Sequence, residues 1–203
     1  MANHVSNNIE LREGNDAVKA EFIKLFQEYG EKVTRPSYHG DGTIEIWEYK
    51  EIQEHPFLEG YSDDNWYQWG CDNIGAKWAH IDDASEYNAY IVSAWSPVIP
   101  YVQKLVEYLA KIDEQVQIRL TYEDEFYNFI GKGDFFWDEY NGIVQEDIEE
   151  EEGSSFNAWL EEKYKVEIDG EFEWHEPNKK MNDQIPQEVL ENRIWEWYDG
   201  AEL

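Results

Sequence analysis

The stretch Gln115-Val-Gln-Ile-Arg-Leu-Thr-Tyr122 alternates polar and apolar side chains without interruption. Alternation with a period of two predicts a β-strand that buries one face and leaves the other to water. The buried face is expected to hold Val116, Ile118, Leu120 and Tyr122. The strand therefore belongs to a sheet with one face on a hydrophobic core.

The residues before this strand predict a second strand and a helix. Residues 87–95 also alternate, and Pro97 or Pro100 then begins a helix that runs to Lys111, since proline is compatible with a first helical turn. The helix has a wide apolar face made of Val98, Tyr101, Val102, Leu105, Val106, Tyr108 and Leu109. Strand, helix and strand thus follow one another between residues 87 and 122.

The N-terminal part of the chain repeats this order. Residues 5–12 predict a strand, residues 17–29 an amphipathic helix with Asp16 as its N-cap, and residues 43–49 a second strand. Residues 50–86 are less regular and rich in aromatic side chains, so we expect an ordered insertion.

After Tyr122, the sequence predicts two more strands, at 126–130 and 133–140, around a turn at Gly131-Lys-Gly133. The whole pattern favours an α+β fold, with a split βαβ antiparallel sheet and two helices on one face. The expected core contains Phe22, Phe26, Ile91, Val102, Leu105, Val116, Ile118 and Leu120. We also expect Trp78 and Trp95 to pack in the core.

Four segments of residues 2–145 resemble a known family. They are Ala2-Asn-His-Val-Ser-Asn7, Asn73-Ile-Gly-Ala-Lys-Trp78, Ser93-Ala-Trp-Ser-Pro97 and Tyr122-Glu-Asp124. They resemble the YubB-type ferredoxin-like domain family of plasmids and phages. His4-Val5 stands where the family has Trp-Cys, and Ala76 where it has Thr. The resemblance implies a ferredoxin-like α+β fold and an origin in a mobile element, and it brings no catalytic residue.

The composition changes after Val144. Residues 146–152 contain six acids in seven positions, which is typical of a solvated tail or linker. We therefore divide the chain into a domain at 1–145, with its insertion at 50–86, and an acidic extension at 146–203. The extension has a net charge of -14, and its apolar residues predict short helices and a hairpin around Asp169-Gly170. We expect residues 154–199 to be folded.

The charge excludes several classes of function. The 46 acids and 16 bases give a net charge of -30, which opposes binding to nucleic-acid phosphates or to an anionic membrane. The 10 Trp, 14 Tyr and 9 Phe nevertheless predict a packed core rather than a disordered polyanion. Cys71 is alone, and neither a signal peptide nor a transmembrane stretch is evident, so a cytoplasmic location is expected, that of the host cell for a phage protein.

The sequence contains little that indicates catalysis. The five histidines lack metal-ligand spacing, and Gly131-Lys-Gly133 lacks the spacing of a phosphate loop. Glu123-Asp-Glu125 is interpreted as a solvated turn rather than an acid/base set. No catalytic residue, metal site or cofactor is predicted.

Two hypotheses of function remain. In the first, the protein is a non-enzymatic DNA mimic that inhibits a host nucleic-acid-handling or defence protein by binding its basic surface. The partner-binding residues would be Asp147, Glu149, Glu150, Glu151, Glu152 and Trp197. Solubility or a high-salt cytoplasm would also account for the charge. In the second, the protein is an enzyme or small-ligand binder whose pocket is lined by Trp66, Trp69, Lys77 and Trp78.

Overall fold

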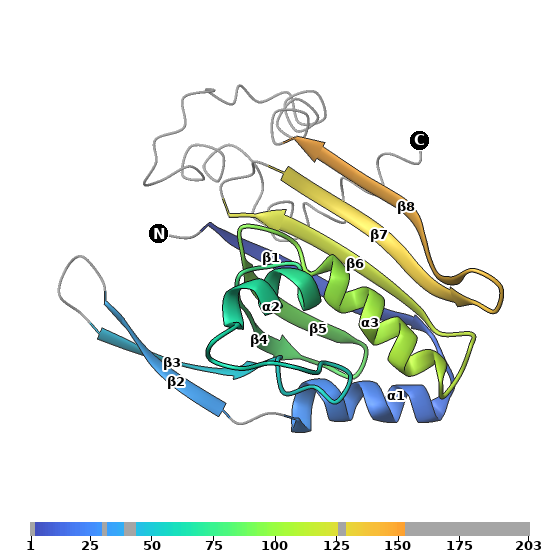
Figure 1. Ribbon diagram of the computed structural model, residues 1–203, viewed down its shortest axis with the longest axis horizontal. Coiled ribbons are helices and arrows are strands. Elements are labelled where there is room, and N and C mark those ends of the chain that lie inside the picture. The colour runs from blue at the N-terminus through green and yellow to red at the C-terminus, as the bar shows by residue number, and fades with distance from the viewer. Residues whose placement is uncertain (1–2, 30–31, 39–43, 126–128, 153–203) are drawn as a thin grey trace, which may run out of the picture.

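The computed structural model describes residues 3–29, 32–38, 44–125 and 129–152 (Figure 1). Its elements in chain order are β1 (His4–Glu13), α1 (Asp16–Ile23), the π-helical turn η1 (Lys24–Glu28), β2 (Lys32–Tyr38), β3 (Ile44–Glu51), α2 (Trp66–Asn73), β4 (Ala79–Ala84), β5 (Asn88–Ala94), α3 (Ile99–Ala110), β6 (Gln117–Asp124), β7 (Phe129–Asp138) and β8 (Gly142–Glu152). The predicted α+β class is confirmed.

The strands form one sheet of eight, in the order β2-β3-β4-β5-β1-β6-β7-β8. Every neighbouring pair is antiparallel. The sheet is larger than the sequence pattern predicted, because β2 and β4 were not expected and β8 continues the sheet beyond β7. The strands β1, β4, β5 and β6 are adjacent at its centre.

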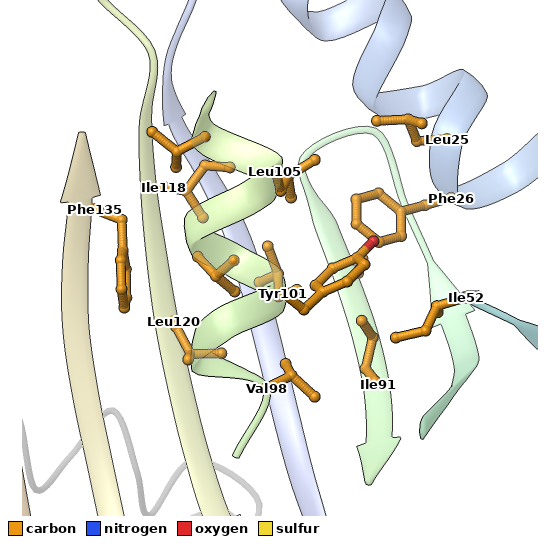
Figure 2. Packing of buried hydrophobic residues seen from close by; sticks show 14 of the residues in the cluster. Leu25, Phe26, Ile52, Ile91, Val98, Tyr101, Leu105, Ile118, Leu120 and Phe135 are labelled. Carbon is orange, nitrogen blue, oxygen red and sulfur yellow. The ribbon is translucent and has the colours of Figure 1, made fainter. Parts of the chain in front are cut away.

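The helices α1, α2 and α3 lie on the same side of the sheet, which we call the helix face (Figure 1). The hydrophobic core fills the space between this face and the helices, and all eight of the expected core residues are buried. Figure 2 shows Tyr101 of α3 beside Phe26 of η1, with ring centroids 6.3 Å apart. The alternation in β6 therefore placed the core correctly.

We call the opposite side of the sheet the far face, and no helix of the described residues packs on it. Its positions follow from the register, since residues that pair in an antiparallel sheet lie on the same face. Ser6 of β1 pairs with Val92 of β5 on one side and with Glu123 of β6 on the other. Val92 in turn pairs with His80 of β4. This face is more polar than the helix face.

The predicted hairpin turn at Gly131-Lys-Gly133 is wrong. Both glycines lie within β7, where Gly131 pairs with Tyr122 and Gly133 with Leu120. A Cβ atom on Gly131 would be 2.6 Å from Cε2 of Tyr122 and would overlap the buried ring. Glycine inside a strand marks a close approach of another group here, not a turn.

The insertion at 50–86 contains regular structure. It includes α2 and β4, and β4 joins the sheet between β3 and β5. The helix expected over 17–29 is divided into α1 and the π-helical turn η1, and its N-cap is Asn15 rather than Asp16. Oδ1 of Asn15 accepts hydrogen bonds from the backbone N–H groups of Ala17 and Val18, at 2.9 and 3.0 Å.

The acidic run at 146–152 is part of strand β8, although the sequence pattern indicated a tail or linker. A short turn joins β7 to β8, and Oδ1 of Asp138 accepts backbone hydrogen bonds from Tyr140 and Asn141 at 3.0 and 2.8 Å. Charged residues are common on edge strands, because they oppose pairing with other chains. The predicted boundary after residue 145 falls within this strand, while residues 153–203 lie outside the described residues.

None of the helices in the described part of the chain is long and apolar enough to cross a membrane.

Candidate binding surface

Four aromatic rings form a row across the far face of β3, β4 and β1, which we call the aromatic row. The centroid of the Tyr49 ring lies 4.5 Å from that of His80, and His80 is stacked with Trp78 at 5.7 Å and an interplanar angle of 13°. Trp78 meets His4 edge to face at 5.5 Å. The row thus presents π-systems from three strands that are distant in the sequence.

Strand alternation places these rings together. Ala79 and Ile81 of β4 are buried in the core, so Trp78 and His80 take the far face. His4 belongs to β1, and Ala94 of β5 lies between β4 and β1 at this level. The small side chain of Ala94 leaves the space in which Trp78 and His4 meet.

Carboxylates flank both ends of the aromatic row. Oε1 of Glu125 accepts a hydrogen bond from the backbone N–H of His4 at 2.9 Å, and Oε2 lies 3.6 Å from the His4 ring Nδ1. Toward the other end, Glu51 of β3 is the register partner of His80, and its Oε2 accepts a hydrogen bond from Nε2 of Gln53. Rings and acids therefore lie side by side on this surface.

A buried polar network fixes the chain between β5 and α3. Asn7 is 1% exposed, and its Nδ2 donates to Ser93 Oγ at 2.9 Å and to the Ile91 carbonyl at 3.1 Å. Its Oδ1 accepts from the backbone N–H of Val98 at 3.1 Å. Ser93 Oγ donates in turn to the Ser96 carbonyl at 2.7 Å. These hydrogen bonds fix Ser93 before Trp95, and Ser96 and Val98 after it.

The prediction that Trp95 packs in the core is wrong, because Trp95 is 53% exposed. Trp95 has φ 74°, in the left-handed region that bulky residues rarely adopt. Its backbone N–H donates a hydrogen bond to the Asn3 carbonyl at 3.0 Å. Strain of this kind persists only where surrounding contacts determine the backbone, and it is frequent at functional sites. Trp78 is half-buried in the aromatic row rather than part of the core.

We expect Trp95→Gly to be more stable than Trp95→Ala by about 1 kcal/mol. Glycine removes the left-handed strain of ~1 to 2 kcal/mol, and its extra entropy in the unfolded chain offsets part of that gain. Alanine is the matched control, because it removes the indole but keeps the Cβ atom. Urea unfolding of both variants measures the difference, and a less stable glycine variant would contradict the strain.

The four residues of the predicted pocket are found in three environments. Nζ of Lys77 lies 5.6 Å from the ring centroid of Trp66, which is 42% exposed on α2. Trp69 is 6% exposed in the core, with its Nε1 donating to the Glu59 carbonyl at 2.7 Å. Trp78 belongs to the aromatic row. Trp66 and Lys77 thus come together, whereas Trp69 lies in the core and Trp78 lies on the far face of the sheet.

A hollow of about 480 Å³ lies at the other end of β1, against β6 and β7. Its lining includes Arg119, which binds Asp134 through two contacts of 2.8 Å, and Arg12, which lies 2.9 Å from Glu10. Both guanidinium groups are neutralised by carboxylates, so the hollow provides no free cation for an anionic ligand.

The predicted partner-binding acids Asp147, Glu149, Glu150, Glu151 and Glu152 all lie on β8. In the register, Glu149 pairs with Lys132 of β7 and Glu151 with Ile130. Trp197, the predicted anchor, lies outside the described residues. In the described residues, no three His, Cys, Asp or Glu side chains are grouped to hold a metal ion.

Comparisons of the chain with protein-family models, with curated proteins and with solved structures found no match. Sequence reasoning missed the aromatic row, although the spacing of Trp78 and His80 by two residues was a signal that they share a face. The place of His4 in the aromatic row had no such signal, because it depends on the order of the strands in the sheet.

Proposed function

We propose that the protein is a non-enzymatic inhibitor that occupies the basic, nucleic-acid-binding surface of a host protein in place of DNA. The observation that carries this proposal is β8, since the run of acids at 146–152 is held in an extended strand of the sheet. A strand fixes the spacing of its residues, whereas a solvated tail does not. The net charge of -30 provides long-range attraction to a basic partner.

The spacing of β8 supports the comparison with DNA. Alternate positions in a strand are ~6.6 to 6.8 Å apart, and successive phosphates of one DNA strand rise by ~3.4 Å along the helix axis. Successive phosphates also rotate about the helix axis, so their separation in space is larger than this rise and is close to the spacing of alternate β8 residues. A groove that binds a phosphate backbone is expected to accept this strand.

The fold supports an origin in a phage or plasmid, through the resemblance to YubB-type domains. We interpret the connectivity β1-α1-β4-β5-α3-β6, with the strand order β4-β5-β1-β6, as a ferredoxin-like unit. We interpret β2 with β3, and β7 with β8, as additions to the two edges of this unit. The protein would then act in the cytoplasm of the host cell.

A charge-neutralised variant tests the role of β8. Asp147→Asn combined with Glu→Gln at positions 149–152 should slow association with the captured host protein about tenfold at low salt, and change dissociation less. The reason is that long-range charge attraction acts chiefly on the encounter rate. The partner is first recovered by pull-down from host lysate at two salt concentrations, and both rates are then measured by surface plasmon resonance.

The matched control removes the same number of charges elsewhere. It neutralises five exposed acids of the described residues, namely Glu54, Glu59, Asp63, Asp64 and Asp82. This control variant should associate nearly as fast as the natural protein. Equal slowing of both variants would mean that only the total charge matters, and would remove β8 as the binding strand.

A further inference from the structure

The aromatic row has a geometry suited to planar groups. Trp78 and His80 are nearly parallel, at 13°, and Tyr49 continues the row at a tilt of 38° from His80. Three of its rings are half-buried and His4 is exposed, so the row is fixed by the sheet and still reaches the surface. Described helices do not pack on this face. Trp78 and His80 cover part of each other's ring faces, so a flat group from solution would stack on the parts of the faces that remain exposed.

The carboxylates around the aromatic row favour a planar group with a positive charge. Glu125 is held beside His4 by the 2.9 Å hydrogen bond from the His4 backbone, and Glu51 pairs with His80. Glu123 pairs with Ser6 on the same face. A planar group that binds here would meet π-faces beneath it and carboxylate oxygens at its edges.

An arginine side chain satisfies both conditions. Its guanidinium is planar, stacks on aromatic rings and pairs with carboxylates through its N–H groups, whereas the lysine ammonium behaves as a point charge. A nucleotide base would also stack, but its phosphate would be repelled by a surface of this charge. Charge complementarity thus favours a cationic occupant.

We propose that the aromatic row, together with Glu51 and Glu125, binds arginine side chains on the basic surface of a protein partner. This inference rests on the proposed function and names the chemistry that the partner must present. It also assigns the far face of β1, β3 and β4 to the interface, in addition to β8.

Two peptides of equal charge test the proposal, octa-arginine and octa-lysine. The full-length protein should bind octa-arginine about tenfold more tightly than octa-lysine in isothermal titration calorimetry, because only arginine gains from stacking. Trp78→Leu should reduce this preference to less than threefold and leave octa-lysine binding unchanged. Trp78→Phe keeps a π-face and should retain part of the preference. A circular dichroism spectrum of each variant confirms that it is folded.

Trp66→Ala provides the matched control, because Trp66 is an exposed tryptophan on α2, and α2 lies on the helix side of the sheet. It should leave the preference for arginine unchanged. Equal affinities for the two peptides in the natural protein, or an equal loss in the Trp66 and Trp78 variants, would overturn the proposal and leave the role of β8 intact. Failure of both peptides to bind would also contradict the proposed function.

Discussion

Gly75→Ala is expected to lower the free energy of unfolding by roughly 3 kcal/mol, one of the two largest effects in this fold. Gly75 has φ 93°, which costs ~1 to 2 kcal/mol for any residue with a Cβ atom. That atom would also lie 3.0 Å from the Pro97 carbonyl oxygen and 3.1 Å from Cγ of Pro100. The proline ring and the backbone cannot rotate away, so the loop before β4 would have to separate from the start of α3.

Gly142→Ala is the matched control, because Gly142 has φ 76° and no atom within 4 Å of an added Cβ. It should cost about 1 kcal/mol, the conformational part alone. Urea unfolding of both variants separates steric overlap from backbone strain. Equal losses in the two variants would show that the contact between the Gly75 loop and α3 is not tight.

The second large effect concerns His55 and pH. His55 is 1% exposed, its Nδ1 lies 2.7 Å from the Tyr101 hydroxyl, and its ring centroid is 5.6 Å from that of Phe26. Burial lowers the pKa of His55 from 6.5 to about 4, the nearby Leu25 backbone partly opposes this shift, and the charge of Lys50 lowers the pKa further. The folded protein therefore holds this imidazole in its neutral form.

The sign of the pH dependence follows from this lowered pKa. The unfolded chain binds a proton at His55 below pH ~6.5, and the folded chain does so only near pH 4. The contribution of neutral His55 to stability is complete above pH 6.5. It decreases as the pH falls below 6.5 and is lost once the pH has fallen through 4. The loss amounts to about 3 kcal/mol.

His55→Gln isolates this contribution, because every other titrating group is shared with the natural protein. Between pH 7.5 and pH 4, the free energy of unfolding of the natural protein should fall by about 3 kcal/mol relative to that of the variant. Chemical denaturation at several pH values measures the difference. Parallel pH profiles for the two proteins would show that His55 is not buried in the neutral state.

The sequence predicted several of the elements that pack on the core, but not α2 or β4. In β6 and α3 the apolar spacing reflects burial directly, so both faces were correct. The end of β6 was wrong, because the strand continues to Asp124, which is 1% exposed, where a solvated turn was expected. The edge strands β2 and β8 were missed, because strands at the edge of a sheet need no apolar alternation. The pairing of β8 depends on the turn closed by Asp138, and its acids obscured any strand pattern.

The candidate surface was harder to predict, since it depends on the strand order. Trp78 and His80 share a face by simple alternation, but His4 joins them only because β5 and β1 follow β4 in the sheet. The exposure of Trp95 depends on φ 74° and on the Asn7 network, and neither has a signature in local composition. Contacts between residues distant in the sequence thus determine the aromatic row and the exposure of Trp95, and local sequence patterns do not reveal such contacts.

The claim that the protein replaces DNA is tested most directly by competition. A labelled DNA duplex is bound to the recovered host protein, and its fluorescence anisotropy is followed while the acidic protein is added at two salt concentrations. We predict full displacement of the duplex, with an apparent affinity that falls steeply as the salt concentration rises. A stable complex that contains the duplex, the host protein and this chain together would contradict the proposed function.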